Sequence, residues 1–172
     1  ANGSSIPETV PLVEIRPAAY ADVVYIARRL READAEEIYP HFFNPTPENL
    51  AFMSVRNQFS YVAFANGEPV AAWGAGMKYP AVWQCWMFST DRWMDVALSV
   101  TRFIKREFAP QIIATDAVRL DCWSADDHHV AHRWLEMLGF IREASVEDYA
   151  ANRVTYHCYS ITRSRLERDD VF

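Results

Sequence analysis

The sequence is poor in glycine and cysteine and has no long apolar run. Only 5 of its 172 residues are glycine and 9 are proline, which excludes collagen-like and low-complexity chains. No apolar stretch approaches the roughly 18 residues of a membrane-spanning helix, so we expect no membrane association. The three cysteines (Cys85, Cys122 and Cys158) are an odd number without metal-ligand spacing. This pattern predicts buried free thiols in a reducing compartment.

Positive charge is also scarce. The chain has 17 basic and 23 acidic residues, a net charge of -6, which argues against binding nucleic acid through its phosphates. No basic region followed by an apolar stretch opens the sequence, so we expect no secretory signal and a cytoplasmic protein. A hydrophobic content of 51% predicts one folded domain. We expect it over residues 13–162, between a flexible tail at 1–12 and a charged, frayed tail at 163–172.

Hydrophobic periodicity predicts an α/β chain. The Asn66-Gly67 pair between two apolar runs indicates a tight hairpin, because both residues tolerate positive φ. The order predicts a mixed central sheet of about seven strands with helices on both faces. The expected strands are 13–16, 61–65, 69–77, 81–88, 118–123, 140–144 and 154–161. The expected helices are 19–31, 32–38, 48–57, one from the capping residues 89–91 to a stop at Pro110, and 126–138.

The segment Ala131–Phe140 (AHRWLEMLGF) carries a family resemblance. Together with the opening strand Val13–Pro17 and the hairpin at Gly67, it resembles the GNAT (GCN5-related N-acetyltransferase) fold, whose penultimate helix ends in Leu-Gly-Phe. The resemblance covers residues 13–162. The pair Thr90-Asp91 and the stretch Arg133–Leu135 are also similar to GNAT-like proteins of short-tailed phages, some of them internal virion proteins.

The resemblance implies an acetyl-CoA site where the fourth strand separates from the fifth. The family's pyrophosphate loop is glycine-rich, but the matching stretch Ser89–Asp95 has no glycine and places Asp91 and Asp95 at the start of a helix. An ordinary helix cap explains these two aspartates better than a cofactor role. The cofactor contacts that the resemblance implies are Met87, Phe88, Ser89, Arg92, Trp93, Met94 and His128.

The catalytic groups that the resemblance implies are incomplete. His128 stands where the family usually has an asparagine, and Leu135 stands where it often has a tyrosine acid. Gln84, in the middle of the fourth strand, cannot act as a base. Asp121 and His128 are our catalytic candidates. Other residues have simpler interpretations: Cys122 as a core residue, and His157 as a strand residue facing solvent.

Two patterns favour a structural explanation over a chemical one. His128 and His132 are four residues apart, a spacing that can bind zinc, but no third ligand is evident, so we predict a solvated helix face and no metal. The acidic run from Glu32 to Glu37 is expected to solvate a helix, although it would also favour a cationic acceptor.

Two functions therefore stay open. The first is an acyltransferase that moves an acetyl group from acetyl-CoA to an amine on a small molecule or protein. The second is an inactive GNAT-fold module that, if encoded by a phage, acts in virion assembly or host takeover through a protein partner or as a homodimer. The second would place the protein in the host cytoplasm or in the virion.

Overall fold

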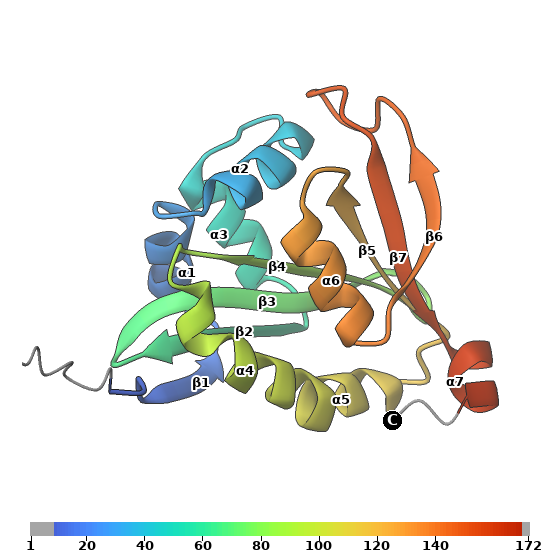
Figure 1. The fold of residues 1–172 in the computed structure, drawn as a ribbon, viewed down its shortest axis with the longest axis horizontal. Coiled ribbons are helices and arrows are strands. Elements are labelled where there is room, and N and C mark those ends of the chain that lie inside the picture. The colour runs from blue at the N-terminus through green and yellow to red at the C-terminus, as the bar shows by residue number, and fades with distance from the viewer. Residues whose placement is uncertain (1–8, 170–172) are drawn as a thin grey trace, which may run out of the picture.

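The computed structural model describes residues 9–169. The chain forms a seven-stranded mixed sheet, as predicted, and its strand order is β1-β2-β3-β4-β5-β7-β6. Figure 1 shows the sheet with its helices. The strands are β1 (Val13–Pro17), β2 (Phe59–Ala65), β3 (Glu68–Tyr79), β4 (Val82–Ser89), β5 (Arg119–Ala125), β6 (Ile141–Val146) and β7 (Tyr156–Thr162). The helices are α1 (Tyr20–Ala27), α2 (Glu32–Ile38), α3 (Pro47–Val55), α4 (Trp93–Phe103), α5 (Ala109–Ile113), α6 (His129–Met137) and α7 (Arg163–Asp169).

Strands β1 to β4 form an antiparallel half-sheet. The Asn66-Gly67 turn joins β2 to β3 with φ of 50° and 80°, which confirms the predicted hairpin. Strand β5 then lies parallel to β4, but the two pair only from Val82 with Arg119 to Gln84 with Asp121. Beyond Gln84 the strands diverge, and β5, β7 and β6 form the second, antiparallel part of the sheet.

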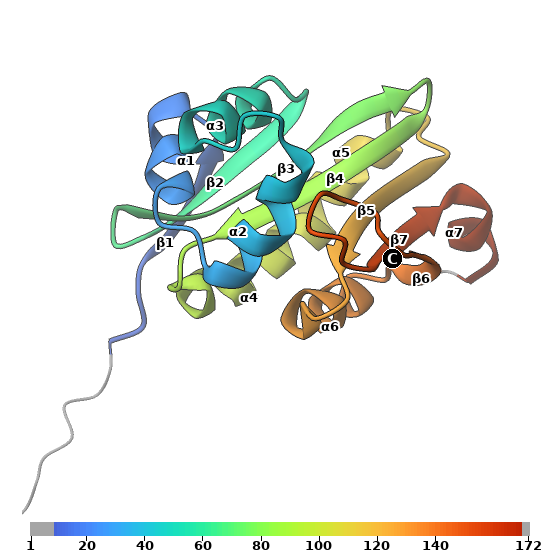
Figure 2. The ribbon, with the colours of Figure 1, turned by 90° about the horizontal axis from the view of Figure 1, so that it is seen from above.

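Helices cover both faces of the sheet, which Figure 2 shows from above. One core lies under α4, α5 and α6 and includes Trp73, Trp83 and Tyr159. The other lies under α1 and α3 and includes Ile26 and Leu50. No helix of residues 9–169 is long and apolar enough to cross a membrane.

The helix expected over residues 19–31 ends at Ala27, which corrects the prediction. A tight turn follows, in which the Arg29 N–H donates to the Ile26 carbonyl at 2.8 Å. The chain can then bring the Arg31 N–H to the Ser89 carbonyl, 2.9 Å away at the end of β4. The apolar periodicity continues to Leu30, but this contact, 58 residues distant in the sequence, requires the chain to turn earlier.

Pro110 does not stop the long helix, contrary to expectation. A π-helical turn, Ile104–Phe108, precedes it, and the helix resumes as α5 with Pro110 in its first turn. A proline is tolerated there because the N–H that it lacks would have no acceptor within the new helical segment. The Ala114 N–H donates to the Pro110 carbonyl at 3.0 Å, so helical bonding continues past the proline.

The charged C-terminal segment is helical rather than frayed as far as Asp169. Arg163 donates to the carbonyls of Ala117 and Ile113, and Arg165 donates to Ser160. These bonds to main-chain groups anchor α7 to the sheet. Residues 170–172 and 1–8, which belong to the two predicted tails, lie outside the described residues.

Candidate functional site

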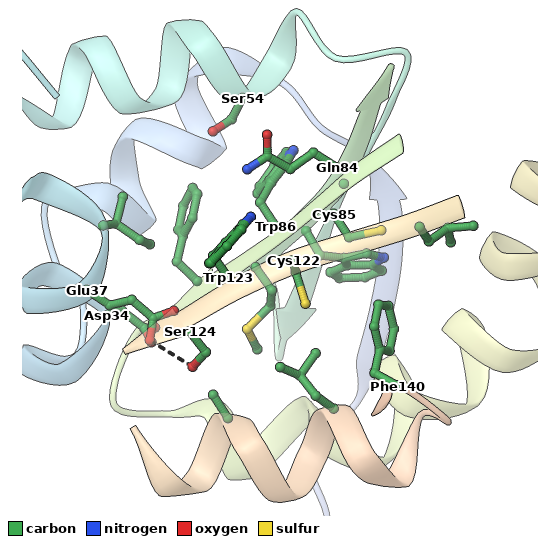
Figure 3. A pocket seen from close by; sticks show the side chains of 18 of the residues that line it. Asp34, Glu37, Ser54, Gln84, Cys85, Trp86, Cys122, Trp123, Ser124 and Phe140 are labelled. Atoms are coloured by element: carbon green, nitrogen blue, oxygen red, sulfur yellow. Dashed lines mark hydrogen bonds between the residues drawn. The ribbon is translucent and has the colours of Figure 1, made fainter. Parts of the chain in front are cut away.

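A cavity of about 540 Å³ lies where β4 and β5 diverge. Residues from both faces of the sheet line it, among them Met53 and Asn57 on one side and Ile104 and Leu138 on the other. It therefore passes through the sheet at the separation of the two strands. Its centre is largely apolar and aromatic, as Figure 3 shows. The central lining residues are Cys85, Trp86 and Met87 of β4, Cys122 and Trp123 of β5, and Trp134 and Leu135 of α6.

The main chain of Met87 faces this cavity. In a strand, residues two apart present their N–H and C=O groups to the same side. The N–H and C=O of Ser89 point away from β3 and toward α2. Those of Met87 point the same way, where β5 has already diverged from β4. Met87 thus offers one donor and one acceptor to a molecule that enters between the strands.

The main-chain groups of Ser89, by contrast, are already bonded within the protein. The Ser89 N–H donates to Oδ2 of Asp34 at 2.7 Å, and its carbonyl accepts from the Arg31 N–H. Arg31 also forms a bidentate ion pair with Asp34, at 2.9 and 3.0 Å. Helix α2 therefore covers the end of β4, and the expected cofactor contact at Ser89 would have to displace these bonds.

His128 lies at the same end of the cavity, between two carboxylates of α2. Its Nε2 is 3.1 Å from Asp34 and its Nδ1 is 3.8 Å from Glu37. Burial lowers the pKa of His128, but the hydrogen bond to Asp34 and the charge of Glu37 outweigh burial, and the pKa is raised. The buried Nδ1 has no hydrogen-bond partner among the described residues. A charged His128 carries a proton on this nitrogen, 3.8 Å from the Glu37 carboxylate.

Glu37 is the carboxylate best placed for proton transfer. Its Oε2 accepts from the Ser124 hydroxyl at 3.1 Å (Figure 3). It also accepts from the Ala125 N–H at 3.1 Å. Burial raises the pKa of Glu37, and the charge of His128 offsets part of that effect. None of the hydrogen bonds among the described residues uses Oε1. A carboxylate with a raised pKa that lines a cavity has the properties of a general base.

The start of α4 does not form a phosphate cradle. The Arg92 N–H donates to the Thr90 hydroxyl and the Trp93 N–H to the Thr90 carbonyl, so two of the three expected amides, all but that of Met94, are internally bonded. The guanidinium of Arg92 pairs with Glu68 and Asp95. The Trp93 side chain is buried, and Met94 is 80% exposed. An incoming pyrophosphate would meet three paired charges and no glycine-rich loop.

The remaining candidates lie outside the cavity or lack the required chemistry. Asp121 is buried in β5 and accepts from Arg119 at 3.1 Å, and it does not line the cavity. Phe88 lines the cavity, but its side chain packs into the core beneath α1 and α3 and has no polar atom. Burial raises the pKa of Cys85 to about 12 and that of Cys122 well above its ordinary value, so both remain thiols. Leu135 offers no proton.

His128 and His132, whose spacing of four residues could bind a metal, contact different partners. His128 contacts Asp34, whereas Nε2 of His132 is 2.8 Å from the Ala125 carbonyl. His157, expected to face solvent, is 4% exposed and lies between Asp126 and Ser145. That expectation was wrong because His132 of α6 packs against the ring of His157, and Ser145 and Asp126 contact its two nitrogens.

The sequence interpretation missed Asp34 and Glu37. It placed the whole acidic run in solvent, but Asp34 is 4% exposed and Glu37 is half-buried. The only feature of the sequence that indicated this is that Asp34 and Glu37 are three residues apart, which puts both carboxylates on one face of α2. Glu32 and Glu36, by contrast, are exposed. The burial of that face follows from contacts with β4 and β5, which no local pattern encodes.

Comparison with protein-family models and with curated protein sequences gives no match. Solved structures do match. A GNAT-family acetyltransferase from Streptococcus pneumoniae is 15% identical over 88% of this chain and 99% of its own, with a TM-score of 0.62. Ard1 from Thermoplasma volcanium is 13% identical over 87% and 97%, with a TM-score of 0.68. The ribosomal-protein-S5-alanine acetyltransferase from Vibrio fischeri is 12% identical over 87% and 92%, with a TM-score of 0.63. The chain therefore has the GNAT fold.

Proposed function

We propose that this protein is an acyltransferase that moves an acetyl group from a pantetheine thioester, as in acetyl-CoA, to an amine. The observation that carries the proposal is the cavity at the β4–β5 separation, with the main chain of Met87 facing it. A pantetheine arm is an extended chain of amides that can pair with an unpaired strand edge. The aromatic and thiol lining of the cavity suits its apolar parts.

The two halves of coenzyme A fit this chain unequally. The arm fits the edge of β4, but at the start of α4 the N–H groups of Arg92 and Trp93 and the guanidinium of Arg92 are already paired within the protein. When bound, the thioester supplies an activated acetyl group. We infer that the arm carries most of the binding free energy and that the nucleotide end contributes little.

The chain's own residues then divide the work. The Met87 N–H donates to the acyl oxygen and stabilises the negative charge that develops there. Glu37 takes a proton from the incoming ammonium, because its raised pKa and its place in the cavity suit a base. His128 positions Glu37 through the contact between its Nδ1 and the carboxylate. We assign no step to Asp121.

Isothermal titration with acetyl-CoA and with acetyl-pantetheine tests the proposal. We expect both to bind, with dissociation constants within about threefold of each other, because the arm that they share carries most of the binding free energy. A tenfold difference would correspond to about 1.4 kcal/mol. Cys122→Phe, which fills the cavity, should abolish both heats. Val118→Phe, a change at a half-exposed position before β5 that does not line the cavity, is the matched control. If neither thioester binds to the wild-type protein, the proposal fails.

A second function is favoured by one specific observation. Asp34 and Arg31 already occupy the main-chain groups of Ser89, so α2 closes the end of the site that a donor would use. This closure suits a GNAT-fold module that binds a partner without chemistry. Such a module would bind neither thioester and would give a stable complex or a homodimer in sedimentation experiments.

A further inference from the structure

A second group of reactive side chains lies outside the cavity, on β6 and β7. The Ser145 hydroxyl is 2.8 Å from Nδ1 of His157, and Nε2 of His157 is 2.6 Å from Oδ1 of Asp126. A hydroxyl, an imidazole and a carboxylate in this order form the arrangement that activates a serine nucleophile. We propose that Ser145 accepts acyl groups from small carboxylic esters, with His157 as its base and Asp126 as a positioning residue.

The contacts fix the tautomer of His157 that this chemistry needs. Hydrogen bonding from His157 holds the pKa of Asp126 below its ordinary value, so Asp126 is a carboxylate and can only accept. Nε2 of His157 therefore carries a proton, and neutral His157 has its free lone pair on Nδ1. That lone pair faces the Ser145 hydroxyl. Here Nδ1 faces the serine and Nε2 faces the carboxylate, which is the reverse of the arrangement in serine proteases. The proton still passes from the serine hydroxyl to the imidazole.

The surroundings leave the nucleophile open and the base enclosed. Every residue of β6, the edge strand that carries Ser145, is exposed, whereas His157 is 4% exposed. The ring of His132 packs edge-on against His157 at 5.4 Å. Nε2 of His132 bonds to a carbonyl and its Nδ1 faces Arg142, so His132 is neutral and adds no charge beside the base.

Arg142 supplies positive charge near the group formed by Ser145, His157 and Asp126. Its guanidinium donates to the Tyr159 hydroxyl at 2.9 Å and lies 3.3 Å from Nδ1 of His132. Its charge also acts on Asp126, where it contributes to the lowered pKa after the hydrogen bond from His157. An oxyanion that forms beside Ser145 would gain from this charge.

The reaction balances without any further reagent. Oγ of Ser145 bonds to the ester carbonyl carbon while its proton passes to Nδ1 of His157. The bond to the leaving alcohol breaks, and the alcohol departs with that proton. Water, activated by the same nitrogen, then releases the carboxylic acid and restores the hydroxyl. This site is separate from the cavity: Ser124, His157 and Ser145 lie opposite one another on three adjacent strands, which places Ser145 about 10 Å from Ser124 at ~4.8 Å per strand.

Labelling with a fluorophosphonate tests the proposal, because this reagent forms an Oγ–P bond and releases fluoride only at activated serines. We expect one label per chain, which peptide mass spectrometry assigns to Ser145. Ser145→Ala should abolish labelling, and Ser164→Ala, at an exposed serine of α7, should not change it. p-Nitrophenyl acetate should give a burst of one p-nitrophenolate per chain.

The positioning role of Asp126 has its own readout. Asp126→Asn should slow labelling by about 10²-fold, and Asp126→Glu should restore part of the rate. Thermal unfolding of each variant separates this effect from loss of the fold, and a merely structural role would not give partial recovery of rate at unchanged stability. Absence of labelling in the wild-type protein would overturn the proposal, as would equal rates in the wild type and Asp126→Asn.

Discussion

The carboxylate of Asp34 accepts a hydrogen bond from the Ser89 N–H at 2.7 Å, across 55 residues of sequence. This bond fastens α2 over the end of β4, at the place where β4 has lost β5 as a neighbour. An unpaired buried N–H is costly, so the fold must supply an acceptor here. Asp34 supplies it, and the same carboxylate holds Arg31 and His128.

The first prediction concerns the stability that Asp34 provides. Asp34→Ala would leave the buried Ser89 N–H and the side chains of Arg31 and His128 without their acceptor. We expect a loss of about 3–5 kcal/mol in the free energy of unfolding, as for other broken buried ion pairs. Urea denaturation measures it. The control is Glu36→Ala, an exposed position of the same helix, for which we expect a change within about 0.5 kcal/mol. Equal effects of the two variants would contradict the role of Asp34.

The second prediction concerns the pH dependence of stability. The folded protein raises the pKa of His128 above its ordinary value of 6.5, so the fold favours the charged form. The stabilisation is therefore fully present below that ordinary value and is lost as the pH rises through the raised pKa. Relative to His128→Gln, the wild type should lose stability as the pH rises above 6.5 and through the raised pKa. Urea titrations of both proteins over a series of pH values measure the difference.

Comparison with His128→Gln isolates this effect from other groups. Burial lowers the pKa values of His41 and His132, which gives the opposite dependence on pH, and burial raises that of Glu37. These contributions occur in both proteins, although Glu37 is coupled to His128 through their contact. A wild-type protein whose stability follows that of the variant over this range would contradict the prediction.

The third prediction concerns the paired charge at the start of α4. Glu68→Gln together with Asp95→Asn should free the guanidinium of Arg92 for a phosphate. We expect acetyl-CoA to bind about three- to tenfold more tightly, or about 0.7–1.4 kcal/mol, and acetyl-pantetheine to bind as before. Isothermal titration measures both.

Glu107→Gln with Glu136→Gln changes the net charge equally at two exposed positions and is the matched control. A similar gain in this control would mean that net charge, and not the release of Arg92, governs the affinity.

The fourth prediction separates the two glycines of β3. A Cβ at Gly74 would meet the carbonyl oxygen of Phe59 and, at 2.6 Å, the ring of Trp86. A Cβ at Gly76 would meet the side-chain oxygen of Asn57, which can rotate away. Gly74→Ala should therefore cost about 1–3 kcal/mol in unfolding free energy, and Gly76→Ala clearly less. Thermal or urea denaturation ranks them, and the reverse order would contradict the packing argument.

The fifth prediction distinguishes the two candidate bases. Glu37→Gln should lower the acetyl-transfer rate constant by about 10²-fold, because the amine loses its proton acceptor. Asp121→Asn should change it by less than about threefold, because Asp121 pairs with Arg119 outside the cavity. Transfer to a polyamine mixture, followed by thiol release, measures both rates. A large decrease in the acetyl-transfer rate constant of a folded Asp121→Asn protein would mean that Asp121 is the catalytic base.

Local sequence patterns were sufficient for most of the fold. Alternation and helical spacing predicted the sheet of seven strands, and Asn66-Gly67 placed the hairpin, because turn geometry depends on the residues that form it. The absence of glycine from Ser89–Asp95 is accompanied by a start of α4 in which the N–H groups of Arg92 and Trp93 bond to Thr90. Whether a pyrophosphate binds there stays a prediction. Each of these features depends on neighbours in the chain.

The candidate site depended on contacts between distant segments. Whether Asp34 and Glu37 face solvent depends on where α2 docks, and whether His157 is covered depends on how α6 packs against it. The relay from Ser145 to Asp126 joins three segments that have no common motif. Sequence therefore determined the elements and their order, because these follow from local backbone preference and apolar periodicity. Only tertiary structure decided which charges were buried and paired, because burial is a property of the packed surfaces.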